Sequence, residues 1–286
     1  MGANSNKTVL VTGCSSGGIG AAICLALARR GHHIIATART VSKIPTELSG
    51  LDNVTLVPLD VTSDESVTAA IATVSATNRT LDVVVNNAGV GYAMPVLDVD
   101  IDRCRQVYKT NVWGPVRVIK AFAPLLIASH GRFVNISTVG SILNCPWIAT
   151  YTSSKAALTA ISDTLRLELQ PLGVEVVTIQ VGIVDSFFHD NDTKFILPKD
   201  SIYSSISSII AGWASGASKP KGISAVAFAE QIVDQIVGHG KTGIVFRGPT
   251  SRYLDYIHRY LPQYFTDVLM SYNQGLKELH AEKQPK

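Results

Sequence analysis

The residues best suited to chemistry are Tyr151 and Lys155, which stand four positions apart in the run YTSSKAAL. At that spacing both side chains project from one face of a helix, one turn apart. A positive charge close to a phenol stabilises the phenolate, so the spacing predicts a tyrosine pKa below its ordinary value of about 10. Tyr151 is therefore a candidate proton donor or acceptor near neutral pH.

A glycine-rich turn, TGCSSGGIG at positions 12–20, follows the first apolar run of the chain. Glycines let the backbone approach phosphate groups, and the helix expected to begin here offers free N–H donors and a favourable dipole. The alternative is a close-packed turn that binds nothing, which the surrounding strand–helix alternation disfavours. The turn predicts a dinucleotide site formed by Gly13, Ser15, Ser16, Gly18, Ile19 and Gly20.

The end of the second predicted strand indicates which dinucleotide binds. An NAD site usually has an acidic residue about twenty positions on, where it accepts hydrogen bonds from the ribose hydroxyls. Here the first carboxylate of the whole chain is Glu47, and the strand ends in Ala38, Arg39 and Thr40. Arg39 can form a bidentate contact with a 2′-phosphate, and Ala38 leaves room for it. The sequence therefore predicts NADP(H), with a solvated surface arginine as the alternative.

Apolar runs alternate with helical patterns along most of the chain. Runs rich in Val and Ile indicate strands buried on both faces, which is typical of a parallel sheet covered by helices. The predicted strands are 8–12, 33–38, 54–59, 82–86, 132–137, 174–179 and 243–246. This pattern predicts an α/β fold, a single doubly wound Rossmann domain over 1–286 with about seven parallel strands and helices on both faces.

Two segments depart from the alternation. Residues 185–222 are too long for a plain connection, and we expect them to form a lid over the substrate. Residues 249–286 form a predicted helical tail with five of the nine tyrosines, most of them at helical spacing. Three roles stay open for this stripe: packing against the body or a partner subunit, lining the substrate pocket, or lying on a membrane or lipid-droplet surface.

Composition narrows the classes of partner. The net charge of +3 and the lack of a basic run argue against nucleic acid. The polar N-terminus leads directly into the first strand, and Arg117 and Lys120 interrupt the longest apolar stretch. We therefore expect a cytoplasmic protein without a spanning helix. The four cysteines lack metal-ligand spacing, so we expect free thiols and no metal site.

These motifs together resemble the short-chain dehydrogenase/reductase family, with matches from residue 12 to about residue 186. The glycine turn has one residue more than is usual there, a variant similar to fungal NADPH-dependent 1-acyldihydroxyacetone-phosphate reductases. The resemblance implies that LDV at 59–61 and NNAG at 86–89 line the adenosine, and that TNVWG at 110–114 supplies a catalytic asparagine. The implied residues are Asp60, Val61, Asn87, Ala88, Gly89 and the catalytic Asn111.

One departure from the family pattern concerns the catalytic serine. Its position corresponds to Thr138, thirteen residues before Tyr151, and Ser137 stands beside it. Consecutive strand residues point to opposite faces, so only one of the two hydroxyls reaches a substrate carbonyl easily. Thr138 is favoured, and Ser137 takes the role if the strand ends in a bulge.

A second departure follows the sixth predicted strand. The family's Pro-Gly pair reads Val181–Gly182 here, and Ser186 replaces the usual threonine. The resemblance implies that Gly182, Val184 and Ser186 contact the nicotinamide carboxamide. Without the proline, we expect a slightly looser turn that keeps this contact.

The resemblance implies reduction of a ketone by hydride transfer from NADPH. Tyr151 would donate the proton to the new alkoxide, while Lys155 lowers the tyrosine pKa and holds the nicotinamide ribose. Asn111 would anchor a water that links Lys155 to solvent, and the Thr138 hydroxyl would polarise the carbonyl. Two alternatives stay open: an isomerisation, dehydration or cyclisation in the same NADP(H) site, or cofactor binding without catalysis.

The expected substrate is a bulky apolar ketone or alcohol: lipid-like, steroid-like or a secondary metabolite. Apolar side chains occupy the segments that should form its pocket, although each could instead close the core. They are Ile142, Leu143, Trp147, Phe187, Phe188 and Trp213. A phosphate on the substrate would need Lys194, Lys199 or Lys219 near the pocket mouth. Helices flanking such sheets commonly pair across a two-fold axis, so a homodimer or homotetramer is expected.

Overall fold

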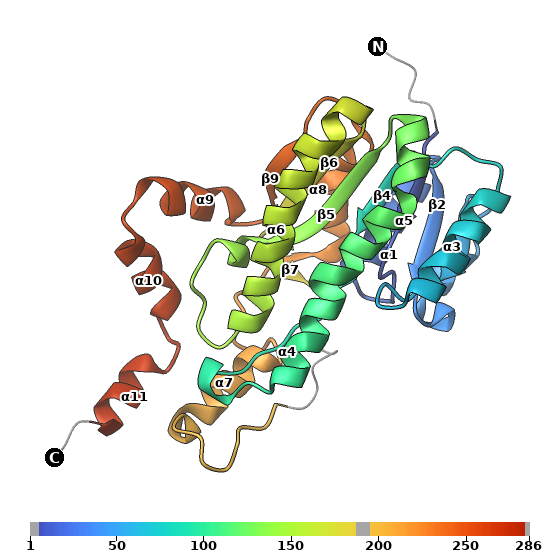
Figure 1. The fold of residues 1–286 in the computed structure, drawn as a ribbon. Helices are drawn as coiled ribbons and strands as arrows, with labels where there is room; N and C mark the ends of the chain where they lie inside the picture. Colours follow the sequence, from blue (N-terminus) through green and yellow to red (C-terminus); the bar gives the residue numbers. More distant parts are fainter. Residues whose placement is uncertain (1–5, 187–194, 284–286) are drawn as a thin grey trace.

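The computed structural model describes residues 6–186 and 195–283, with one sheet at its centre (Figure 1). Its seven strands are all parallel, in the order β3-β2-β1-β4-β5-β6-β9. Their bounds are β1 Thr8–Val11, β2 His33–Ala38, β3 Val54–Pro58, β4 Val83–Asn86, β5 Arg132–Thr138, β6 Glu175–Val181 and β9 Gly243–Arg247. Each matches a predicted strand to within two residues, so the expected doubly wound α/β fold is confirmed.

Helices surround the sheet and extend beyond it. Their bounds are α1 Ile19–Ala28, α2 Thr46–Ser49, α3 Asp64–Ala76, α4 Ile101–Tyr108, α5 Gly114–Ser129, α6 Ala149–Leu169, α7 Ser207–Ala214, α8 Ala225–Val237, α9 Ser251–Tyr260, α10 Gln263–Ser271 and α11 Leu276–Lys283. Short helical turns include η1 Val41–Lys43, η4 Val139–Ser141, η7 Ser204–Ile206 and the π turn η3 Lys109–Trp113.

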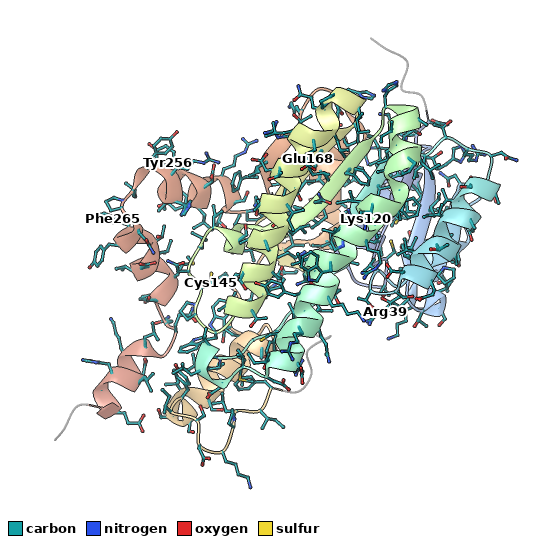
Figure 2. All side chains as sticks on the ribbon, in the orientation of Figure 1. Arg39, Lys120, Cys145, Glu168, Tyr256 and Phe265 are labelled. Atoms are coloured by element: carbon teal, nitrogen blue, oxygen red, sulfur yellow. The ribbon has the colours of Figure 1, made fainter. Side chains whose placement is uncertain are left out.

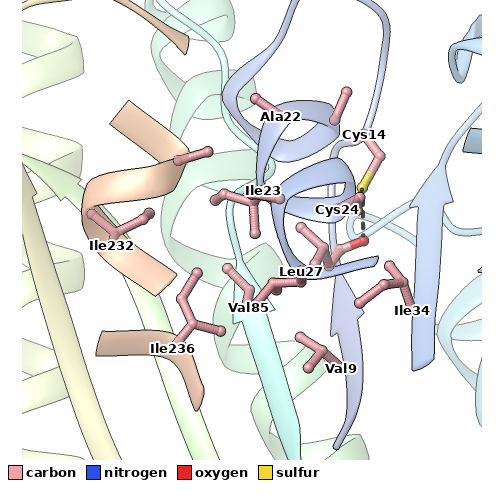
Figure 3. Close-up of a cluster of buried hydrophobic side chains, with 14 of the residues drawn as sticks. Val9, Cys14, Ala22, Ile23, Cys24, Leu27, Ile34, Val85, Ile232 and Ile236 are labelled. Carbon is pink, nitrogen blue, oxygen red and sulfur yellow. Dashed lines mark hydrogen bonds between the residues drawn. The ribbon is translucent and has the colours of Figure 1, made fainter. Parts of the chain in front are cut away.

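The core has two layers because alternate strand residues face opposite sides of the sheet. Val9 and Val11 of β1 pack with α1 and α8, whereas Leu10 between them packs with α3 and α5. Figure 3 shows the first layer, where Ile23 of α1 meets Ile232 of α8. The same view shows the Cys14 and Cys24 sulfurs, which lie 3.4 Å apart as free thiols. Burial of both strand faces explains the near-continuous apolar runs.

The segment Ile101–Ser129 is one continuous helix of 29 residues, formed by α4, η3 and α5. By length and composition alone it is apolar enough to cross a membrane. In the structure its fully buried residues Val118, Phe122 and Leu126 pack against the sheet. Core helices pass the same test, and we assign this helix to the core layer.

The two irregular segments differ in structure. Within 185–222 the described residues include α7, and the segment is closed at its base by two short paired strands, β7 Val184–Asp185 and β8 Ile223–Ser224. Phe187, Phe188 and Lys194 lie outside the described residues. The tail forms α9, α10 and α11, which extend as an arm from the β9 side of the sheet (Figure 1).

Candidate active site

The glycine turn between β1 and α1 ends in an uncapped helix N-terminus. Gly13 and Gly17 have φ values of 75° and 73°, which glycine adopts without strain. The first intrahelical bond runs from the N–H of Ala22 to the carbonyl of Gly18, at 3.3 Å, so the preceding amides have no helical partner. Within this helix no side chain caps the first turn and no acidic residue stands in it. An anion would meet free donors and the positive dipole end here.

The glycine turn lies directly against the loop after β4. A Cβ on Gly13 would lie 2.8 Å from the Cα of Ala88, and a Cβ on Gly20 would lie 2.5 Å from Asn87 Nδ2. Asn87 Nδ2 donates to the carbonyl oxygens of Thr12 and Gly13 at 2.9 and 3.1 Å. The Thr12 hydroxyl in turn accepts from the N–H groups of Asn87 and Ala88, both at 3.0 Å. Residues predicted from two separate motifs therefore form one surface.

Replacing Gly20 with Ala tests this close approach. The new Cβ would lie 2.5 Å from the carbonyl oxygen of Gly13, so backbone must move. We expect a loss of about 1–3 kcal/mol in the free energy of unfolding, the usual cost of overpacking, together with weaker nucleotide binding. Urea denaturation and a fluorescence titration with NADPH would measure both. Gly50→Ala is the control, because its Cβ would meet nothing closer than 3.7 Å; equal effects of the two changes would contradict the expectation.

The loop after β2 lies beside the same turn. The N–H of Ser16 donates to the carbonyl of Lys43 at 2.8 Å, which ties η1 to the glycine turn. Arg39 and Thr40, at the start of this loop, are exposed. The first carboxylate of the chain, Glu47, already pairs at 2.8 Å with Arg29, the residue that follows α1. The loop therefore offers cationic side chains for a phosphate, and Lys43 adds one that the sequence motifs did not single out.

Asp60 and Val61 follow β3 at the same edge of the sheet. Asp60 Oδ1 accepts from the N–H and the hydroxyl of Thr62, both at 2.8 Å, which fixes the carboxylate. Val61 is buried, and a Cβ on Gly114 would lie 2.8 Å from its Cγ2. The glycine at the start of α5 thus lets that helix approach the loop expected to face the adenine.

Lys155 and Asn111 converge on Gly89. A Cβ on Gly89 would lie 3.4 Å from Lys155 Nζ and 3.3 Å from Asn111 Oδ1. Asn111 is completely buried within the π turn η3, and π turns often occur at functional sites. Its Oδ1 accepts from the N–H of Val90 and its Nδ2 donates to the carbonyl oxygen of Val90, both at 2.9 Å. The same Nδ2 lies 3.0 Å from the Ser154 hydroxyl, to which it donates. The loop after β4, η3 and α6 therefore meet at one point.

The expected tuning of Tyr151 by Lys155 is wrong for this structure. Both residues lie on α6, but burial is the cause of both shifts: it raises the pKa of the Tyr151 phenol and lowers the pKa of Lys155 to about 8. Burial disfavours the charged form of either group, which here outweighs any attraction between ammonium and phenolate. Lys155 Nζ donates to the carbonyl oxygen of Ile136 at 2.9 Å. At neutral pH, Tyr151 is therefore a protonated phenol.

Ser137 and Thr138 have different surroundings. The buried Ser137 hydroxyl lies 2.9 Å from Thr159 Oγ1 on α6, so it is engaged between strand and helix. Thr138 is partly exposed at the end of β5, and its hydroxyl accepts from the N–H of Gly140 at 3.2 Å. The strand shows no shift that would turn Ser137 outward: Ser137 and Thr138 pair in register with Gln180 and the residue after it on β6. The Thr138 hydroxyl also donates to the Val181 carbonyl oxygen at 3.4 Å, so its exposure is what favours it over Ser137 as the hydroxyl for a substrate.

These arrangements agree with the comparisons to known proteins. A family model for short chain dehydrogenases matches residues 7–195. The chain belongs to the short-chain dehydrogenase family. The short-chain dehydrogenase ptmH of Penicillium ochrochloron is 43% identical over 264 residues, covering 92% of this chain and 96% of that protein. The NADPH-dependent 1-acyldihydroxyacetone phosphate reductase of Schizosaccharomyces pombe is 35% identical over 253 residues, covering 85% and 82%.

Solved structures show that other short-chain dehydrogenases share this fold. One from Streptomyces avermitilis has a TM-score of 0.76 at 25% identity and covers 98% of this chain and 99% of its own. One from Burkholderia cenocepacia, solved in complex with NADP, has a TM-score of 0.74 at 22% identity and covers 93% and 98%. As a short-chain dehydrogenase, this protein is an oxidoreductase that binds a nicotinamide cofactor and acts on a small molecule.

The expected nicotinamide contacts of this dehydrogenase lie after β6. The N–H of Gly182 donates to the carbonyl of Arg247 at 2.8 Å, and a Cβ on Gly182 would overlap the Pro249 carbonyl oxygen. Val184 is buried in β7, and Ser186 is partly exposed at the end of the described segment. This turn is thus held against β9 without the family's proline.

The side chains expected to line the dehydrogenase's substrate pocket divide between two packed clusters. Leu143 is buried with Leu254 of α9, and Ile142 packs against that cluster. Trp147 is buried with residues of α7, and its Nε1 donates to the carbonyl of Gln274 at 3.1 Å. Trp213 is only partly buried beside it. Leu143 and Trp147 therefore close the core beneath the arm and α7.

The structure describes two of the three lysines suggested for a substrate phosphate. Lys219 Nζ donates to the Val184 carbonyl at 2.8 Å and pairs with Asp185 at 2.7 Å. That lysine therefore anchors the base of the segment 185–222. Lys199 is exposed, and Lys194 lies outside the described residues.

A buried polar network behind the site was missed by sequence reasoning. The fully buried Gln180 of β6 accepts from the Ser141 hydroxyl and donates to Thr159 Oγ1, both at 3.1 Å. Thr159 Oγ1 then donates to the carbonyl oxygen of Lys155 at 2.8 Å. The network links the loop after β5, β6 and α6, and so fixes the helix that carries Tyr151. The glutamine within the mostly apolar run of β6 was the one hint of it in the sequence.

Proposed function

We propose that this short-chain dehydrogenase uses NADPH to reduce the ketone of a bulky apolar substrate to an alcohol, with Tyr151 as the proton donor. The observation that carries the proposal is the convergence of Lys155 and Asn111 on Gly89, next to an uncapped helix N-terminus. Tyr151 stands one helical turn before Lys155. A protonated phenol is the form that a reduction requires, because the step delivers a proton to an alkoxide.

Each residue has a distinct role in the proposed step. Bound NADPH would supply the hydride. The Tyr151 hydroxyl donates its proton to the substrate oxygen as negative charge develops there, and the Thr138 hydroxyl donates a second hydrogen bond to that oxygen. The Lys155 ammonium holds the nicotinamide ribose hydroxyls. With Asn111 beside it, Lys155 lies on the route by which a proton returns to Tyr151.

NADPH is proposed over NADH because of the loop after β2. Arg39 is exposed there, Lys43 is its second cation, and the loop is bonded to the glycine turn. A guanidinium matches the fork geometry of a phosphate. The reductase of Schizosaccharomyces pombe, whose name includes NADPH, supports this choice.

Replacing Arg39 with Asp tests the cofactor choice. We expect the KM for NADPH to rise by about 10- to 100-fold, the equivalent of losing a charge-assisted hydrogen bond of about 1.5–3 kcal/mol. The KM for NADH should stay level or fall, because it has no 2′-phosphate to repel. Arg79→Asp is the control. Arg79 is also exposed, but it precedes β4 and so lies at the N-terminal ends of the strands, whereas Arg39 follows the C-terminal end of β2. An unchanged ratio of the two KM values would contradict the proposal.

The substrate class is proposed as a lipid-like, steroid-like or secondary-metabolite ketone. The acyldihydroxyacetone phosphate named for the relative supports it, and of the expected lining residues Ile142 and Trp213 are only partly buried. We propose residues 185–222 as the lid and the cytoplasm as the site of action. A panel of such ketones, followed by NADPH absorbance, is the direct test.

A non-reductive reaction is the second candidate, because Thr138 replaces the family's usual serine. An isomerisation, dehydration or cyclisation would need NADP(H) bound but not consumed. The same panel separates the two: loss of NADPH absorbance with alcohol formation supports reduction. Product formation at constant absorbance supports the alternative, and tight cofactor binding without any product would indicate a non-enzymatic role.

A further inference from the structure

The C-terminal arm carries an aromatic surface that the rest of the described chain leaves uncovered. We call it the arm face, and each of its side chains is at least 41% exposed. Its members are Tyr253, Tyr256, Tyr260, Leu261, Tyr264, Phe265, Val268, Leu269 and Tyr272. They are nine of the nineteen large hydrophobic side chains exposed on the described part of the chain. Figure 2 shows Tyr256 and Phe265 pointing away from the body.

Helix α10 presents its apolar side outward. Tyr264, Phe265, Val268 and Leu269 recur at the spacing that lines one helix face, and all are exposed. The other side of α10 faces the protein, where Asp267 accepts a hydrogen bond from Asn144 at 2.9 Å. A surface helix normally turns its apolar face inward. Among the described residues, none covers this apolar side of α10.

The arm is anchored, so the arm face is a defined surface. Met270 of α10 accepts a hydrogen bond from Cys145 Sγ at 3.6 Å, and Gln274 accepts one from Trp147 Nε1 at 3.1 Å. Leu254 of α9 is buried in the cluster beneath. Side chains of the arm face also contact one another, since the ring centroids of Tyr256 and Tyr260 lie 4.8 Å apart.

We propose that the arm face is the interface with a second copy of this chain. A buried aromatic side chain contributes about 150–250 Å². The six aromatic residues are 53% to 71% exposed, so they alone present roughly 600–900 Å². A standard interface buries about 800 Å² per partner, and a monomer rarely exposes so large an apolar patch. A two-fold axis through the arm would cover the face with the same face of the partner.

The charges of the arm distinguish this partner from a membrane. The three helices of the arm, residues 251–283, contain two arginines, two lysines, two aspartates and two glutamates, and Arg259 pairs with Asp255 at 2.7 Å. Helices that lie on membranes usually have a polar face rich in lysine and arginine, which this arm lacks. Protein interfaces are instead enriched in tyrosine and phenylalanine and depleted of charge at their centre.

The proposed interface lies directly behind the loop after β5. The residues that anchor the arm, Asn144, Cys145 and Trp147, belong to the loop that approaches the catalytic helix. Pairing of two arms would therefore stiffen this loop in each subunit.

Sedimentation of the full chain tests the proposal, with Val268→Asp as the variant and Val226→Asp as the matched control. The two valines are 53% and 52% exposed, on α10 and α8 respectively. We expect wild type and Val226→Asp to be dimers. In Val268→Asp the dissociation constant should rise by at least about 30-fold, as expected for a charge at an interface hot spot. Circular dichroism and the melting temperature would show that both variants fold.

Three results would overturn the proposal. The first is a wild-type protein that sediments as a monomer at every concentration tested. The second is a dimer that persists in Val268→Asp, which would place the interface elsewhere. The third is wild-type monomer that co-sediments with phosphatidylcholine–phosphatidylserine vesicles, with binding lost in Val268→Asp, because the arm face would then cover itself with lipid.

Discussion

Replacing Tyr151 with Phe should lower kcat for ketone reduction by about 10²- to 10⁴-fold, the range that a positioned general acid contributes. The change removes one hydroxyl and keeps the aromatic ring. Because burial raises the pKa of this phenol, the group is protonated at neutral pH and is an acid that the reaction loses. Stopped-flow measurement of NADPH oxidation under single-turnover conditions would isolate the chemical step.

The matched control for Tyr151→Phe is Tyr108→Phe. Tyr108 lies on neighbouring α4 and its hydroxyl contacts Ser153 of α6 at 3.0 Å, so it also loses a hydrogen bond to this region. We expect an ordinary kcat from it. The dissociation constant for NADPH should be the same in both variants and wild type. A Tyr151→Phe enzyme that retains wild-type turnover would remove Tyr151 from the mechanism.

Replacing Lys155 with Met should stabilise the cofactor-free protein near pH 7 while it removes activity. Burial lowers the pKa of Lys155 to about 8, against an ordinary value of 10.5. Folding therefore carries the cost of burying an ammonium whenever the pH is below about 8. Methionine removes that cost but leaves the carbonyl oxygen of Ile136 without its donor. The first effect is worth about 3.4 kcal/mol and the second costs about 1–3 kcal/mol, so we expect a net gain of about 0.5–2.5 kcal/mol in the free energy of unfolding.

The stability difference between wild type and Lys155→Met should depend on pH. Between about pH 8 and 10.5 the unfolded wild type holds a proton on Lys155 that the folded protein has released. The free energy of unfolding of wild type therefore rises with pH across this window, relative to the variant. Urea denaturation at several pH values would show the difference between the two shrinking. The control is Lys120→Met, which changes an exposed lysine of α5 (Figure 2) and should show no such trend. A Lys155→Met protein that is less stable than wild type near pH 7 would contradict the expectation.

Local pattern was enough to predict the sheet. Val9, Leu10 and Val11 are all apolar because helices cover both faces of β1, and this depends only on the order of side chains along a strand. The glycine turn was equally readable. Positive φ at Gly13 and Gly17 and an uncapped N-terminus at Gly18 follow from residue type at fixed positions.

The candidate site was predictable where it depended on spacing along one element. Tyr151 and Lys155 lie on one helix, so their common face follows from helical geometry. The resemblance implied that Asn111 and Lys155 act together, but only the structure shows that they meet at Gly89, because three separate segments bring them together. The sequence left the choice between Thr138 and Ser137 open; the structure adds that the Ser137 hydroxyl is buried against Thr159, which favours Thr138.

The sequence by itself determined which candidate features follow one another along the chain: a glycine-rich turn, a cationic loop and a tyrosine–lysine pair. Tertiary structure decided the pKa directions of Tyr151 and Lys155, because desolvation depends on how many atoms from distant segments surround a group. It also decided that Trp147 closes a core and that the tyrosines of the arm point outward. A helical stripe shows that one face is apolar, but only the packed chain shows whether its own body covers that face.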